Sequence, residues 1–181
     1  MDYNLYWYEE PCWPESIDGL QEVARALPFP IATGERLTTK YEFGRVLENR
    51  AASILQMALG RVGGLTEAKK IAGMAETFYA QIAPHLYAGP VEGAANIHYA
   101  ASLPNFLILE SIEEWGGFHA EVLKKPILWQ DGYVIPPSEP GLGTTFRVYI
   151  TANVGAAVVA VLPPPPISPP PAGNQSPSPI A

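Results

Sequence analysis

Four side chains that could bind a metal ion or move a proton each follow a short apolar run of the sequence. They are Glu9 after "LYWY", Glu35 shortly after "PIAT", His85 after "AQIAP" and Glu110 after "FLIL". A fifth run, "SILQMAL", contains Ala58 at the remaining point of the same series. The five positions recur at intervals of roughly 25 residues, which suits the strand–helix unit of a β/α barrel, where functional groups gather at the carboxyl ends of the strands.

The two carboxylates at successive strand ends indicate a magnesium site. Glu9 and Glu35 would face one another across the opening of such a barrel, and carboxylate oxygens are ligands that Mg²⁺ prefers. A single acid at a strand end is more often only solvated, but two in phase with the repeat favour a metal site. Glu10 points away from Glu9 along an extended strand and is the weaker candidate.

The histidine and the last acid suggest proton transfer. His85 could act as a general base near neutral pH, although a lone histidine is as often structural. Glu110 could hydrogen-bond a developing enolate, or it could merely end a strand. His98, in a helix-like segment, and His119, in a loop that contains glycine, are interpreted as structural or surface residues.

The elements that would position these side chains alternate between strand and helix. The five apolar runs are predicted to be strands, and helical patterns follow the first four of them. These patterns cover 16–27, a segment after the possible capping box of Thr39 and Glu42, a segment from Thr66, and roughly 93–102. The alternation predicts βαβ units and a parallel sheet, with five of the eight strands of a barrel.

Composition limits the partners and the location of the chain. The 181 residues carry a formal charge of −7, which argues against nucleic acid as a partner. Cys12 is the single cysteine, so no intrachain disulfide can form, and the N-terminal residues lack the pattern of a signal peptide. We therefore expect a reducing, cytoplasmic location and no membrane partner.

The C-terminal part differs in composition from the rest. Arg147 is the last charged residue, and a proline-rich stretch ends the chain. We predict a barrel part over 1–146 and a disordered or polyproline tail over 147–181. The apolar segment "VYITANVGAAVVAVL" is short for a membrane span. A reading of the chain as an interaction module that docks through "PPPPISPPP" rests on the tail alone.

The order of six segments resembles a known enzyme family. They are "YWYEEP", "PIATGERL", "GRVGGLTEAKKIAGMAE", "IAPHLYAGP", "LPNFLILE" and "PGLG". Together they resemble the enolase superfamily, in its mandelate racemase and muconate-lactonizing branch, and are closest to acid-sugar dehydratases of the galactonate type. The resemblance covers about Leu5 to Gly143.

The resemblance implies a fold and a reaction. Members have a modified eight-stranded β/α barrel and a separate capping domain, and they abstract the proton α to a carboxylate with the intermediate held on Mg²⁺. By resemblance, Glu9 and Glu35 are metal ligands. His85 is the base, or the acid that expels a hydroxyl, and Glu110 hydrogen-bonds the intermediate. Arg36 follows a ligand and is a weaker candidate for a substrate contact.

Two departures from the family pattern limit this expectation. Ala58 stands where the family has an aspartate that pairs with the histidine, and the capping domain and first three strands have no counterpart in this sequence. We expect a dehydratase by family, with a racemase or epimerase as the alternative reaction. The chain by itself is expected to be an inactive fragment that self-associates through open barrel edges. Its charge-free, proline-rich end fits a shifted reading frame or a fusion boundary.

Overall fold

A parallel sheet of four short strands organises the chain. The computed structural model describes residues 4–111, 115–121, 123 and 125–136. The strands lie in the order β1-β2-β3-β4 along the sheet and all pair in parallel. Their bounds are Tyr8–Glu9, Ile31–Thr33, Ile54–Leu55 and Gln81–Ile82.

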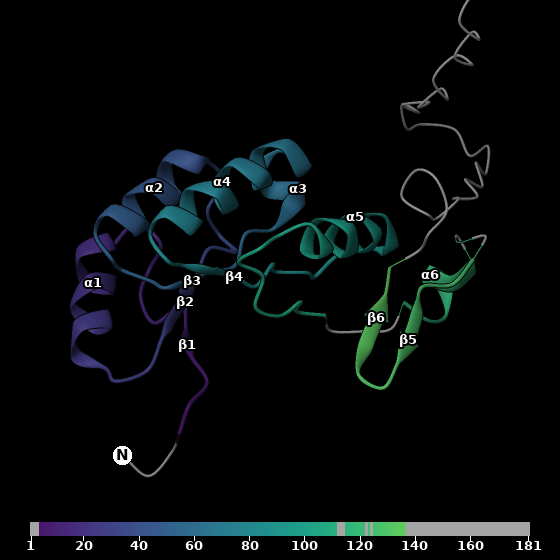
Figure 1. The fold of residues 1–181 in the computed structure, drawn as a ribbon, viewed down its shortest axis with the longest axis horizontal. Coiled ribbons are helices and arrows are strands. Elements are labelled where there is room, and N and C mark those ends of the chain that lie inside the picture. Colours follow the sequence, from purple (N-terminus) through teal and green to yellow (C-terminus); the bar gives the residue numbers. More distant parts are fainter. Residues whose placement is uncertain (1–3, 112–114, 122, 124, 137–181) are drawn as a thin grey trace, which may run out of the picture. The chain divides into compact units, whose positions relative to one another are not determined.

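Each strand is followed by a helix, as in a β/α barrel. The four helices after the strands are α1 (Ile17–Ala26), α2 (Lys40–Glu48), α4 (Leu65–Thr77) and α5 (Pro90–Ala101), and a single turn, α3 (Leu59–Val62), precedes α4. Helices α2 and α4 lie side by side over one face of the strands (Figure 1). The described part of the chain also includes the short helix α6 (Phe118–Glu121) and an antiparallel ribbon of β5 (Leu128–Gln130) and β6 (Tyr133–Ile135).

The strands present different residues to their two faces because side chains alternate along a strand. Ile31, Leu55 and Ile82 belong to the large buried cluster beneath the helices. Their neighbours Ala32 and Ile54, together with Ala83 just beyond β4, form a second, smaller cluster on the other face. The candidate side chains lie beyond the carboxyl ends of the strands.

The predicted alternation of strands and helices is confirmed, but the strands are shorter than the apolar runs. The run at 53–59 supplies only a two-residue strand before the chain turns into α3 at Leu59. The fifth run contributes one parallel bridge, between Ile82 and Phe106, rather than a full strand. Ile82 N–H donates to Asn105 O at 2.9 Å and Leu107 N–H donates to Ile82 O at 2.8 Å, so the parallel pattern does continue there.

The helix boundaries agree with their sequence signals. The capping box of α2 is present, since Thr39 Oγ1 accepts from the Glu42 backbone N–H and the Glu42 carboxylate accepts from the Thr39 N–H at 2.8 Å. Helix α5 begins at Pro90, earlier than the predicted start near residue 93, because proline suits the first helical turn. The single turns α3 and α6 and the β5–β6 ribbon were not predicted from the sequence.

Two further expectations concern the C-terminal part of the chain. The boundary between 146 and 147, and the apolar and proline-rich segments after it, lie outside the described residues and stay predictions. Within the described residues, the structure contains no helix with the length and apolar character that crossing a membrane requires.

Candidate active site

Three of the four predicted side chains meet at the carboxyl ends of the strands. Glu35 lies just beyond β2, His85 just beyond β4, and Glu110 beyond the fifth apolar run. The imidazole Nδ1 of His85 lies 2.8 Å from Glu110 Oε2 and 3.2 Å from Glu35 Oε2. Residues separated by up to 75 positions (110 − 35) in the sequence therefore form one cluster.

The cluster of one imidazole and two carboxylates remains open to solvent. The side chain of His85 is 20% exposed, and those of Glu35 and Glu110 are each 34% exposed. Neither carboxylate lies in line with the ring N–H, so the two short contacts do not have hydrogen-bond geometry.

Local backbone contacts place the members of the cluster. Glu110 Oε2 also accepts from the Leu86 backbone N–H at 3.3 Å, which ties the fifth run to the segment after β4. His85 N–H donates to Met57 O at 3.2 Å, and His85 pairs with Ala58 in a parallel bridge. The sheet pairing thus continues from β3 and β4 up to the histidine.

Ala58 is the direct neighbour of His85 on the adjacent strand end. It is buried, with a relative exposure of 6%, and its methyl side chain offers no acceptor to the imidazole. The position that the resemblance assigns to the dyad aspartate therefore lies beside His85, but the residue there has no carboxylate. Within the described residues, the carboxylates next to the ring nitrogen come from Glu35 and Glu110 instead.

Glu9 makes its contacts apart from this cluster. Its Oε2 accepts from Trp7 Nε1 at 3.0 Å and from Gln56 Nε2 at 2.8 Å. Gln56 is a site residue that the sequence reasoning missed. Its signal was a polar residue inside an apolar strand run, two positions after Ile54 and hence on the same face.

Glu10 has a structural role, in agreement with its low rank as a ligand. Its carboxylate accepts from Thr33 Oγ1 and from the Gly34 N–H, each at 2.8 Å, and forms an ion pair with Arg36. Arg36 also donates to Cys12 O at 3.1 Å. The structure therefore uses Arg36 to join the segments after β1 and β2; the substrate contact considered for it is not tested.

The predicted magnesium ligands Glu9 and Glu35 make their contacts in different places. Glu9 and Glu35 provide the oxygen donors that Mg²⁺ prefers. Gln56 Oε1, beside Glu9, is buried without a hydrogen-bond partner among the described residues. A buried acceptor of this kind fits a site that receives a donor from a bound group. No set of three or more His, Cys, Asp or Glu side chains in the described part of the chain is arranged to hold a metal ion.

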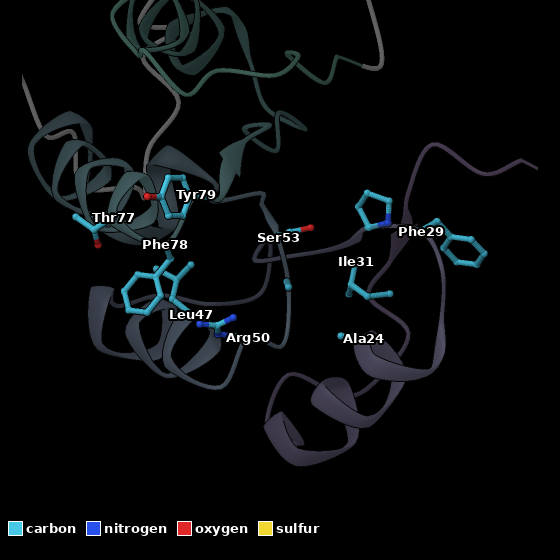
Figure 2. Close-up of a pocket in the computed structure, with 11 residues that line it drawn as sticks. Ala24, Phe29, Ile31, Leu47, Arg50, Ser53, Thr77, Phe78 and Tyr79 are labelled. Atoms are coloured by element: carbon cyan, nitrogen blue, oxygen red, sulfur yellow. The ribbon is translucent and has the colours of Figure 1, made fainter.

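A hollow of about 600 Å³ lies at the opposite ends of the strands (Figure 2). Its lining includes Ile31 and Ser53 at the strand starts, Arg50 after α2, and Phe78 and Tyr79 after α4. None of the four predicted side chains contributes to it. The candidate chemistry therefore rests on the residues at the carboxyl ends and not on this hollow.

Comparison with known proteins identifies relatives of the chain. Residues 1–150 match the model of the family described as enolase C-terminal domain-like. The chain is 35% identical over 144 residues to D-xylonate dehydratase of Haloferax volcanii, covering 80% of this chain and 35% of that protein. It is 38% identical over 150 residues to D-galactonate dehydratase of Ralstonia nicotianae, covering 78% and 38%.

Solved structures agree with this relationship. A protein from Labrenzia alexandrii that is described as a mandelate racemase/muconate lactonizing enzyme is 62% identical, with a TM-score of 0.75, over 78% of this chain and 36% of that one. An enolase from Agrobacterium radiobacter, with sodium and L-malate bound, is 34% identical, with a TM-score of 0.72, over 78% and 39%. The chain thus spans between 35% and 38% of the length of the two curated relatives.

Proposed function

The chain belongs to the enolase superfamily, in the branch of mandelate racemase and muconate-lactonizing enzymes, and on that premise we propose that it supplies half of the active site of an acid-sugar dehydratase. Its relatives include dehydratases that act on D-xylonate and D-galactonate. The proposed reaction removes the proton α to the substrate carboxylate and expels the hydroxyl on the next carbon. The resulting enol tautomerises to a 2-oxo-3-deoxy acid.

The observation that carries the proposal is the cluster of His85 with Glu35 and Glu110. A histidine can take up or release a proton near neutral pH, which both the abstraction and the loss of hydroxide need. Glu110, held by the Leu86 N–H, would hydrogen-bond the substrate while negative charge develops on the substrate carboxylate.

Glu9 and Glu35 are the proposed ligands of Mg²⁺. When bound, the ion supplies positive charge that stabilises the negative charge developing on the substrate oxygens. Two carboxylates are fewer oxygen ligands than a hard cation takes, so the remaining ligands would come from water, substrate or another part of the assembled protein.

A racemase or epimerase of the same superfamily is the alternative reaction, favoured by the neighbours described as mandelate racemase/muconate lactonizing enzymes. Both reactions begin with the same proton abstraction and differ in whether a hydroxyl leaves. We further propose that the chain by itself is inactive, because Ala58 gives His85 no carboxylate partner on the adjacent strand end. Its proposed partners are a sugar-acid substrate and other copies of the chain, in a cytoplasmic setting.

A chimera tests the proposed function. Residues 1–143 would replace the matching part of the Ralstonia D-galactonate dehydratase, with Ala58→Asp added to one version and Ala58 kept in the other. The version with Ala58→Asp is expected to form 2-oxo-3-deoxy acid from D-galactonate or D-xylonate, and the additional change His85→Asn to abolish this. Exchange of the α-hydrogen with solvent deuterium, without loss of the hydroxyl, would indicate the racemase alternative.

The control for this chimera is His119→Asn, since His119 belongs to α6 and not to the cluster. A folded chimera with Ala58→Asp that shows neither dehydration nor exchange, while the parent dehydratase is active in the same assay, would contradict the proposal. Equal activity in the chimera and its His85→Asn variant would also contradict it.

A further inference from the structure

One oxygen of Glu9 is occupied by two donors from the protein. Trp7 Nε1 donates to Oε2 from the same strand, two positions earlier, and Gln56 Nε2 donates to the same oxygen from the end of β3. Strand β2 lies between β1 and β3, and the residue paired with Glu9 there is Ala32. Because Ala32 has only a methyl group, the Gln56 side chain can pass over β2 and reach the carboxylate.

The other oxygen of Glu9 has no hydrogen-bond or ion-pair partner among the described residues. We propose that Gln56 is a positioning residue, which holds Glu9 by Oε2 and so presents Oε1 as a single oxygen ligand to a divalent cation. The inference rests on the proposed function of Glu9. A free carboxylate can turn and bind a cation through either or both oxygens, whereas one held at Oε2 by two fixed donors presents Oε1 in one direction.

The buried amide of Gln56 supports the same assignment. Gln56 is 2% exposed, and its Oε1 is shielded from solvent with no partner in the described part of the chain. The reverse orientation of the amide would place that oxygen against the Glu9 carboxylate, and the two oxygen atoms would repel each other. This repulsion fixes the orientation of the amide. An unsatisfied buried acceptor is unfavourable. A donor at the cation site would satisfy it, and the water that Mg²⁺ retains in protein sites is the donor we assign.

The test compares Gln56→Met with a matched control in the complete 181-residue chain. Methionine keeps the length of the side chain and removes both the donor and the acceptor. The control is Asn96→Leu, because Asn96 is also a fully buried amide, at 0% exposure, whose oxygen lacks a partner in the described residues. Asn96 donates to Glu92 O within α5 and does not contact Glu9.

Cation binding is measured with Mg²⁺ by calorimetry and with Tb³⁺ by emission excited through tryptophan, since the Trp7 ring lies beside Glu9. Gln56→Met is expected to weaken binding by about 10- to 100-fold, the usual effect of removing a residue that orients a ligand. Both Gln56→Met and Asn96→Leu are expected to lower the unfolding temperature. Asn96→Leu is expected to leave the dissociation constant of the cation unchanged. Glu9→Gln defines the signal that belongs to this site.

A measurement without metal gives a second, independent readout. The indole N–H resonance of Trp7 reports the carboxylate that it contacts, so Gln56→Met is expected to shift it and Asn96→Leu to leave it in place. If Glu9→Gln loses cation binding while Gln56→Met binds as the original chain does, the inference is wrong and the proposed function stands. The same comparison is made in the chimera with D-galactonate dehydratase, which supplies the remaining ligands. If neither the original chain nor the chimera binds either ion at Glu9, both the inference and the proposed function are wrong.

Discussion

At the scale of single residues, the adjacent acids Glu9 and Glu10 have different surroundings because strand β1 ends at Glu9 and the backbone turns at Glu10. Glu9 lies at the open end of the sheet beside Trp7. Glu10 turns the other way, in a left-handed backbone conformation with φ of 45°. Its carboxylate is enclosed by Thr33, Gly34 and Arg36, with 13% of the side chain exposed. One acid is therefore available for a ligand, and the other holds two loops together.

This difference predicts that a change of glutamate to glutamine affects stability at position 10 and Mg²⁺ binding at position 9. Glu10→Gln removes the charge that binds Arg36 and is expected to lower the free energy of unfolding by about 2 kcal/mol, as for a charge-assisted hydrogen bond. Glu9→Gln is expected to change stability little and to abolish the Mg²⁺ heat in calorimetry. Denaturant unfolding and titration of both variants make the comparison. If Glu10→Gln loses Mg²⁺ binding and keeps its stability, Glu10 is the cation ligand and this prediction is wrong.

Ala58 leads to a second prediction at this scale. In Ala58→Asp a carboxylate would stand beside His85, so we expect a closer partner for the imidazole but no turnover by the chain alone. The reason is that fewer than three acidic or histidine ligands are arranged for a cation in the described residues. Deuterium exchange at the α-carbon of D-galactonate, followed by NMR, should stay at the background rate. Clear exchange above background would show that two carboxylates are enough.

The sequence could predict which residues meet, but not all of their contacts. The regular spacing of strand ends selected Glu35, His85 and Glu110, which lie together because parallel strands end at one edge of a sheet. It also selected Glu9, which makes its contacts elsewhere. Spacing carries no information on side-chain direction, so it did not reveal that both acids approach Nδ1 of His85. Gln56 was missed because a polar residue in an apolar run looks like an interruption until its partner, 47 positions away, is known.

At the scale of elements, the start of α2 is stabilised by a carboxylate that must be ionised. Partial burial of Glu42 acts to raise the pKa of its carboxyl group, but hydrogen bonds from Thr39 and Thr38 outweigh it and hold that pKa below the ordinary value of 4.5. A carboxyl with a lowered pKa in the folded state stabilises the protein above its unfolded pKa. The contribution is lost as the pH falls through the lowered folded value.

Glu42→Gln should therefore flatten the acid side of the stability curve. At neutral pH we expect a loss within about 0.5 kcal/mol, because the group is largely exposed and glutamine can also close a capping box. Below pH 4.5, the free energy of unfolding should fall more steeply with decreasing pH in the original chain than in the variant. Urea unfolding followed by circular dichroism across this range measures the difference. Parallel curves for the two proteins would contradict it.

Element types followed from the sequence more reliably than their lengths. The capping box and the spacing of Phe43, Val46 and Leu47 identify α2 because these signals are local. Strand length depends on which neighbours pair, and pairing is a property of the assembled sheet. The run at 106–109 illustrates this, since only Phe106 bridges to β4 although all four residues are apolar.

At the scale of the whole molecule, the sheet has an open edge at each end in the described structure. Strand β1 pairs only with β2 in the described structure, and at the other end Phe106 pairs with Ile82 of β4. Exposed apolar side chains lie at both ends, including Tyr8 at 45% and Ile108 at 46% exposure. Unpaired edges with apolar side chains favour pairing with other chains.

The chain is therefore expected to self-associate, and a charge at the edge should reduce this. Sedimentation velocity of the original chain should show an average mass that increases with concentration. Ile108→Lys places a charge on the open edge, where lysine opposes further pairing, and should shift the distribution toward monomer. Val91→Lys is the matched control, because Val91 is 52% exposed but lies on α5. Equal effects of the two lysines would indicate general charge repulsion and not pairing at the edge. If the original chain is a monomer at all concentrations, its open edges are protected and the prediction is wrong.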